Sequence, residues 1–205
     1  SGNPWATEDD VGVRFVKLFD SRVEIVQAAG FTIGVQVTGL ASGYNYFQLG
    51  AFRDNHIGLD ISTYATGWVN ENVFVGGRFS SSGSVNPTLS RYGIRIFGSS
   101  THSSNQNVFL KPSFELGIGG LSQGAEAIPA LIVKGDNNTF ISCRNEGGVT
   151  GPFARTMNDS QGNKFDVSSG TADVDEQSIY KTSISVCRQT EFPSQPGKLV
   201  FASGR

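Results

Sequence analysis

The sequence is poor in charge and in the residues that build metal sites. Charged residues make up 17% of the 205-residue chain, its formal net charge is −2, and it contains no run of Lys or Arg. Phosphate binding needs a concentrated basic face, so we expect no nucleic-acid partner. The two cysteines, Cys143 and Cys187, lack metal-ligand spacing, and we expect no metal and no cofactor. The sequence leaves open whether they form one disulfide or stay as buried thiols.

Several familiar motifs are also absent. No apolar run approaches the length of a membrane span, so membrane insertion is not expected. The chain has no Gly-x-Ser-x-Gly, phosphate-loop, His-Glu-x-x-His or calcium-loop pattern, which leaves the common hydrolase, nucleotide and zinc-protease signatures without support. The abrupt opening at Ser1-Gly2 is typical of a fragment that has lost a targeting signal or another domain.

What the chain does have is a repeated asparagine–phenylalanine pattern. It contains 26 Gly and 15 Phe against a single Met, a profile that suits stacked β-structure better than helices. Intervals of 25 to 35 residues separate five copies of Asn-x-Phe. A unit of this length is typical of a solenoid, in which each copy buries its apolar face only by stacking on its neighbours. The copies are Asn45–Phe47, Asn72–Phe74, Asn107–Phe109, Asn138–Phe140 and Asn163–Phe165.

A second repeated segment precedes each copy. Its apolar residues alternate with a period of two, which predicts strands with one buried face. We expect each unit to contain this strand, then the Asn-x-Phe strand, then a short third strand, which is the layout of a parallel β-helix. The predicted first strands are Gly34–Val37, Gly58–Ile61, Gly93–Ile96, Ala130–Val133 and a degraded copy at Phe153–Arg155.

The predicted fold is therefore an all-β parallel β-helix of about five to six coils. Residues 1–169 would form it, with an incomplete entry coil at the amino-terminal end. Residues 170–205 lose the repeat and would form a cap or the start of a further module, because the ends of a solenoid need covering.

The repeat also predicts which side chains lie inside. The Asn and Phe of each copy are two residues apart and share one side of the strand, so both should point inward. Buried amides must be hydrogen-bonded, and we interpret the five Asn residues as a structural ladder along the stack. Phe52, Phe79 and Phe114 each follow the motif Phe by five residues and predict a second internal stack, in which Asn145 replaces the aromatic ring of the fourth coil.

Positions six and eight after each motif Asn should point outward. They include Arg78 and Arg144 at the first position and Arg53, Glu115 and Glu146 at the second. In register, Glu115 stands over Glu146, and like charges that close raise the pKa of one partner. An acid beside a base suits glycosidic cleavage, with the arginines holding substrate. Ligand contact without chemistry and a simple solvated ion-pair surface are the alternatives.

Two further groups are candidate substrate contacts. Arg53, Asp54 and His56 lie close in sequence, with Asp60 nearby; this group is either an acid–base site or a loop His bonded to an Asp for structural reasons. Trp68 lies in a turn segment, where it either stacks on a sugar ring or packs the turn.

The run from Gly67 to Phe79, GWVNENVFVGGRF, resembles a segment of right-handed β-helix tail proteins of bacteriophages, the pectate-lyase-like tailspikes. The segments NYFQLG at Asn45–Gly50, NHIGL at Asn55–Leu59 and NVFLKPSFE at Asn107–Glu115 fit the same group. The resemblance implies a right-handed, homotrimeric spike on a virion or outside the cell that binds, and often cleaves, a bacterial surface polysaccharide. It transfers no catalytic residue. A non-enzymatic structural or adhesin module of a virion fibre, and a secreted bacterial polysaccharide lyase, hydrolase or epimerase, are the alternatives.

Overall fold

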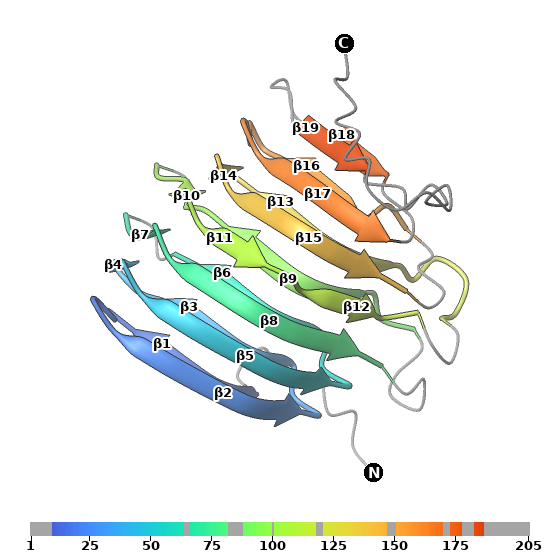
Figure 1. Ribbon diagram of the computed structural model, residues 1–205, viewed down its shortest axis with the longest axis horizontal. Helices are drawn as coiled ribbons and strands as arrows, with labels where there is room; N and C mark the ends of the chain where they lie inside the picture. The colour runs from blue at the N-terminus through green and yellow to red at the C-terminus, as the bar shows by residue number, and fades with distance from the viewer. Residues whose placement is uncertain are drawn as a thin grey trace, which may run out of the picture.

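The described part of the chain is all-β and contains no helix (Figure 1). The computed structural model describes residues 10–63, 66–81, 88–99, 101–117, 121–146, 151–169, 173–177 and 183–186. Two large sheets form two layers, and strands that follow one another along the chain alternate between them. The strand pairings within both sheets are parallel.

The first sheet has seven strands, and its strand order follows the order of the sequence. These strands contain the predicted alternating segments, apart from Phe153, which immediately precedes the sixth strand; most of their residues are buried, and the outward positions are at most partly exposed. In chain order they are β1 (Val11–Val16), β3 (Ile33–Thr38), β6 (Ile57–Ser62), β9 (Arg91–Phe97), β13 (Ala127–Val133), β16 (Ala154–Met157) and β18 (Val174–Gln177).

The second sheet has eight strands and carries the Asn-x-Phe copies. Motif residues of successive copies pair in register, as Phe47 with Phe74 and Phe74 with Phe109. Its strands are β2 (Arg22–Ala29), β5 (Tyr46–Arg53), β8 (Val73–Ser80), β11 (Val108–Leu110), β12 (Ser113–Glu115), β15 (Thr139–Asn145), β17 (Lys164–Ser169) and β19 (Ser183–Val186).

Four short strands lie between a first-sheet strand and the second-sheet strand that follows it. They pair as β4 (Ala41–Gly43) with β7 (Trp68–Asn70) and as β10 (Ser104–Asn105) with β14 (Gly135–Asp136). The sequence places the short strand after the Asn-x-Phe strand, and this order is wrong. In β8 the chain continues through Gly76 and Gly77, at φ 77° and 94°, so that Phe74 and Phe79 both face inward although five residues separate them.

The ends of the described chain also contribute strands. β1 and β2 pair with the second repeat, and Phe19 makes an isolated bridge with Gly43 where later repeats have a short strand. β18 and β19 extend both sheets beyond residue 169. The assignment of 170–205 to a cap or a further module stays a prediction, and most of that segment lies outside the described residues.

The asparagine ladder is confirmed. All five motif asparagines are buried, and each of the first four amides donates to the amide oxygen of the next, at 2.9 to 3.1 Å. The same oxygens accept backbone N–H groups of the preceding asparagine. A buried amide is stable only with its polar atoms paired, and here the pairing ties neighbouring repeats together.

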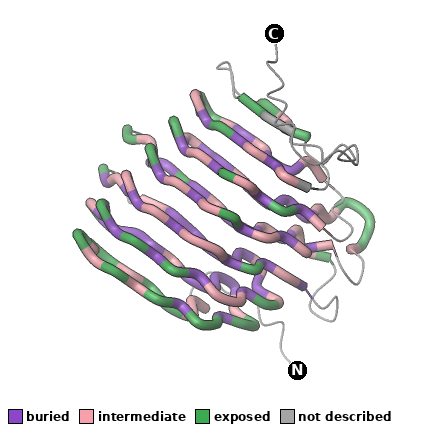
Figure 2. Tube along the Cα trace, in the orientation of Figure 1, coloured by how far each residue is buried: buried purple, intermediate pink, exposed green. Residues whose placement is uncertain are grey.

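Phenylalanine stacks fill the core between the two sheets. The five motif rings stack with centroids 4.4 to 5.1 Å apart. Phe52, Phe79 and Phe114 form the expected second stack, which ends on Phe153 in an edge contact. Figure 2 shows the resulting buried interior. Cys143 is a free, buried thiol in this core, and burial raises its pKa; Cys187 lies outside the described residues.

Candidate functional site

The charged side chains predicted to share one face do lie along one end of the second sheet. We call Arg53, Arg78, Glu115, Arg144 and Glu146 the ionic row. They lie at or just beyond the carboxyl ends of β5, β8, β12 and β15, where Ser113 pairs with Arg78 on one side and with Arg144 on the other. Parallel pairing aligns equivalent positions, so the register of the core also sets the spacing of this surface.

Both carboxylates of the ionic row are bound to arginines. The Arg78 guanidinium donates two hydrogen bonds to Glu115, at 3.2 Å from Nε and 2.7 Å from Nη2. Arg144 forms an ion pair with Glu146. The arginine side chains are 64% and 56% exposed, so their guanidinium groups also face solvent. The row therefore presents donors and acceptors in fixed positions on an open surface.

Of the expected carboxylate pair, Glu115 does not have a raised pKa. The hydrogen bonds from Arg78 are the largest influence and hold the pKa of this carboxyl below its usual value, against a smaller opposing effect of burial. A general acid needs a raised pKa to carry a proton near neutral pH. In this geometry Glu115 is a hydrogen-bond acceptor, and it is poorly suited to protonate a leaving group.

In the structure, His56 and Asp60 contact residues of the neighbouring strand β9. Asp54 occupies a bend at φ 54°, and the His56 ring lies beside the ring of Tyr92 with centroids 5.7 Å apart. Burial, and secondarily the charge of Arg95, lower the pKa of His56 to about 4. Asp60 is fully buried and pairs with Arg95 at 2.6 Å. The Asp60 carboxylate is therefore bound by an arginine of the neighbouring first-sheet strand.

Trp68 lies at the other end of the repeat from the ionic row. It belongs to β7, which precedes β8, whereas the row follows the far ends of strands such as the eight-residue β5. Strands of that length separate the two places by about 25 Å. The half-buried Trp68 ring reaches over Gly43 to Phe19, with ring centroids 5.8 Å apart. Trp68 and the ionic row thus cannot contact one sugar unit together.

A second polar arrangement, missed from the sequence, crosses the outer face of the first sheet. Arg14 donates to Gln36, Gln36 donates to Asp60, and Asp60 accepts from Arg95, at 2.6 to 2.8 Å. Farther along, Arg155 pairs with Asp175 and with Glu126. Apart from Glu126, which immediately precedes β13, these residues occupy paired positions of first-sheet strands, and Leu131 takes the equivalent position on β13. Aligning those strands, as was done for the Asn-x-Phe strands, would have revealed the arrangement.

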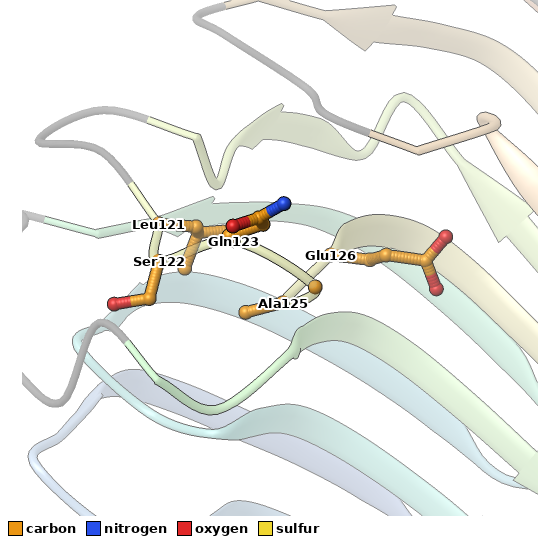
Figure 3. A pocket seen from close by; sticks show the side chains of 6 residues that line it. Leu121, Ser122, Gln123, Ala125 and Glu126 are labelled. Atoms are coloured by element: carbon orange, nitrogen blue, oxygen red, sulfur yellow. The ribbon is translucent and has the colours of Figure 1, made fainter.

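An open hollow of about 430 Å³ lies beside the segment 121–126. Figure 3 shows that its lining side chains come from this one segment and that the Glu126 carboxylate points away from Leu121, Ser122 and Gln123. That carboxylate is held by Arg155. The hollow lacks converging polar groups from separate elements, which a small-molecule site needs.

The described residues include no group of three or more His, Cys, Asp or Glu placed to hold a metal ion. Within the same ranges, no helix has the length and apolar character needed to cross a membrane. No protein-family model matches the chain, and no curated protein matches it.

Proposed function

We propose that the chain is a right-handed parallel β-helix of the tailspike kind that binds a bacterial surface polysaccharide through the ionic row. The parallel pairing, the in-register repeats and the stacked Asn and Phe residues support the solenoid. The resemblance at Gly67–Phe79 supports the right hand, a homotrimer and a place on a virion or outside the cell.

The observation that carries the proposed function is the openness and fixed geometry of the ionic row. Its members lie on neighbouring strands about 4.8 Å apart, and the Arg78 and Arg144 side chains are largely exposed along that end of the sheet. A linear polymer of hydroxyl- and carboxylate-bearing rings can follow such a surface. Exposed guanidinium groups of Arg78 and Arg144 donate to carboxylates and hydroxyls, and carboxylates of Glu115 and Glu146 accept from hydroxyls.

The lowered pKa of Glu115 favours binding of a polysaccharide at Glu115 and Glu146 without its cleavage. A retaining glycosidase places two carboxyl groups about 5–5.5 Å apart and keeps one of them protonated as the acid. The strand spacing permits such a distance between Glu115 and Glu146. The lowered pKa of Glu115 opposes the acid role, because the carboxylate stays ionised beside Arg78.

A purely structural or adhesin module of a virion fibre is the second candidate. It is favoured by the ion pairs within the row, since exposed pairs of this kind also occur on surfaces without ligands.

A panel of purified acidic and neutral capsular polysaccharides, tested for equilibrium binding and for released reducing ends, separates the candidates. We expect saturable binding to an acidic polysaccharide without new reducing ends. If reducing ends are released and the Glu146→Gln variant no longer releases them, the enzymatic hypothesis would be supported instead. Failure to bind any polysaccharide of the panel would favour the structural module.

A further inference from the structure

Three aromatic side chains gather at the edge of the stack where the short strands β4 and β7 lie (Figure 1). The Phe19 and Trp68 rings meet edge to face across Gly43, which has no side chain to separate them. Tyr44 directly follows Gly43, and its hydroxyl donates a hydrogen bond to Glu71 of the next repeat. Phe19 and Tyr44 are 40% and 58% exposed. We call Phe19, Tyr44 and Trp68 the aromatic corner.

The fold does not require an aromatic ring at the position of Tyr44. Its backbone has φ 60°, in the left-handed region, because it occupies the turn that precedes each motif asparagine. The equivalent residues of the next three repeats, Glu71, Gln106 and Asn137, adopt the same conformation at φ 53° to 57° and are all polar. A polar side chain therefore serves this turn equally well, and the exposed ring of Tyr44 calls for another explanation.

A column of amide and carboxylate side chains continues from the aromatic corner along the short strands. Gly43 pairs with Asn70, and the Asn70 side-chain oxygen accepts the backbone N–H of Asn105 at 2.8 Å. Asn105 in turn pairs with Asp136, and all three side chains of the column are partly exposed. Within the part of the chain that the structure describes, the Asn70 amide nitrogen and the Trp68 indole nitrogen have no acceptor. Planar donors and acceptors thus border the rings.

Two carboxylates near the Tyr44 hydroxyl limit which ligand this corner accepts. The hydrogen bond to Glu71 is the largest influence that raises the pKa of Tyr44, and the charge of Asp20 adds to it. Carboxylates repel an acidic polymer but accept hydrogen bonds from hydroxyl groups. An exposed aromatic ring offers an apolar face against which the C–H groups of a sugar ring can pack. The aromatic corner therefore suits a neutral sugar, whereas the ionic row suits an acidic one.

We propose that the aromatic corner is a second saccharide site, which binds a neutral sugar residue stacked on Tyr44 beside Trp68. Asn70 and Glu71 bond the hydroxyl groups of this sugar, and Phe19 holds the Trp68 ring from the side. The proposal rests on the ligand class of the proposed function but on none of the residues of the ionic row. A polysaccharide that contains neutral and acidic units can occupy both sites, and the linkage strengthens its overall binding.

Trp68 is a direct probe of this site. The chain has two tryptophans, so a Trp5→Phe background leaves the emission of Trp68 alone. We expect titration with maltohexaose or laminarihexaose, neutral oligosaccharides of α- and β-linked glucose, to change this emission with a dissociation constant on the order of 1 mM. The absence of a saturable change with either oligosaccharide up to about 20 mM would overturn the site.

Substitution of the tyrosine tests the stacking. Tyr44→Ala should weaken binding of the oligosaccharide about tenfold or more, because the ring face is lost. Tyr44→Phe keeps the ring and should bind within about threefold of the wild type. Tyr46→Ala removes an exposed tyrosine from the second sheet and is the matched control, which should bind like the wild type. Circular dichroism verifies the fold of each variant. Equal affinity of Tyr44→Ala and wild type would contradict the stacking.

Arg78→Ala separates this site from the proposed function. This variant should bind the neutral oligosaccharide like the wild type, because Arg78 lies at the other end of the repeat. Tyr44→Ala should likewise leave the binding of a short acidic oligosaccharide unchanged. Binding of acidic but not of neutral oligosaccharides would count against the aromatic corner alone. Binding of neutral but not of acidic oligosaccharides would count against the ionic row alone.

Discussion

The amide of Asn72 donates a hydrogen bond to the amide oxygen of Asn107 across two neighbouring repeats, at 3.0 Å. The backbone N–H of Asn72 donates to the same oxygen at 3.2 Å. Both residues are fully buried. Two repeats are thereby held in one register, and that register sets the positions of the outward columns on which the site depends.

Removal of one amide from this ladder should be costly. Asn107→Ala deprives Asn72 of its acceptor and the Val69 carbonyl of its donor, and it leaves these polar groups buried. We expect a loss of roughly 3 kcal/mol or more in the free energy of unfolding, measured by urea denaturation. Asn105→Ala, at a partly exposed site nearby, should cost less than about 1 kcal/mol. Equal losses in the two variants would contradict the structural role of the ladder.

Gly43 should not tolerate a side chain. A Cβ atom there would lie 2.8 Å from the Asn70 carbonyl oxygen and 2.9 Å from the Trp68 ring. Gly43→Ala should destabilise the fold by about 1–3 kcal/mol, because the ring and the neighbouring strand must shift. In Gly43→Ala/Trp68→Ala the ring clash is removed, and we expect Gly43→Ala to cost less in that background, as a double-mutant cycle would show. Additive costs in the cycle would contradict the contact.

Acid should destabilise the chain in part through His56. The unfolded chain binds a proton on this ring at the ordinary pKa of 6.5, whereas the folded chain binds it only near 4. Protons therefore favour the unfolded state, and stability should fall as the pH drops from about 6.5 to about 4, by on the order of 3 kcal/mol before solvent screening. His56→Gln should flatten this part of the stability profile, measured by denaturation at several pH values. His102→Gln at the exposed histidine is the control, and an identical flattening there would contradict the assignment.

Arg78 should control the ionisation of Glu115. Removing the guanidinium in Arg78→Ala removes the hydrogen bonds that lower the Glu115 pKa, so the carboxyl should titrate at higher pH. Carboxyl-carbon NMR of the folded protein measures this directly. Arg53→Ala changes another arginine of the ionic row and should leave the titration of Glu115 nearly unchanged. If Arg78→Ala does not move the titration, the ion pair does not form in solution.

The sequence predicted which side chains lie inside the fold better than it predicted where the short strands lie. The Asn-x-Phe spacing identified the inward asparagines and both ring stacks, because burial repeats along the chain with the same period as the structure. The position of the short strands was wrong, because the chain continues within one strand through Gly76 and Gly77, whose backbone has positive φ, and two phenylalanines five residues apart both lie inward. An alternating pattern does not show where a strand continues through such a change of backbone conformation.

For the candidate site, too, the sequence predicted some features and not others. In-register stacking predicted that Arg78, Glu115, Arg144 and Glu146 share a face, and they do. Strand register does not predict which of these side chains form ion pairs. The pairing of Arg78 with Glu115 depends on side-chain rotamers. The closeness of like charges therefore did not reveal that Arg78 lowers the pKa of Glu115.

Equilibrium binding of an acidic capsular polysaccharide to wild type and to arginine variants tests the central claim most directly. Arg78→Ala and Arg144→Ala should each weaken binding about tenfold or more, because each removes charge-assisted hydrogen bonds to the ligand. Arg14→Ala removes an exposed arginine from the outer face of the first sheet and should bind like the wild type. Equal affinity in all four proteins would contradict recognition through the ionic row.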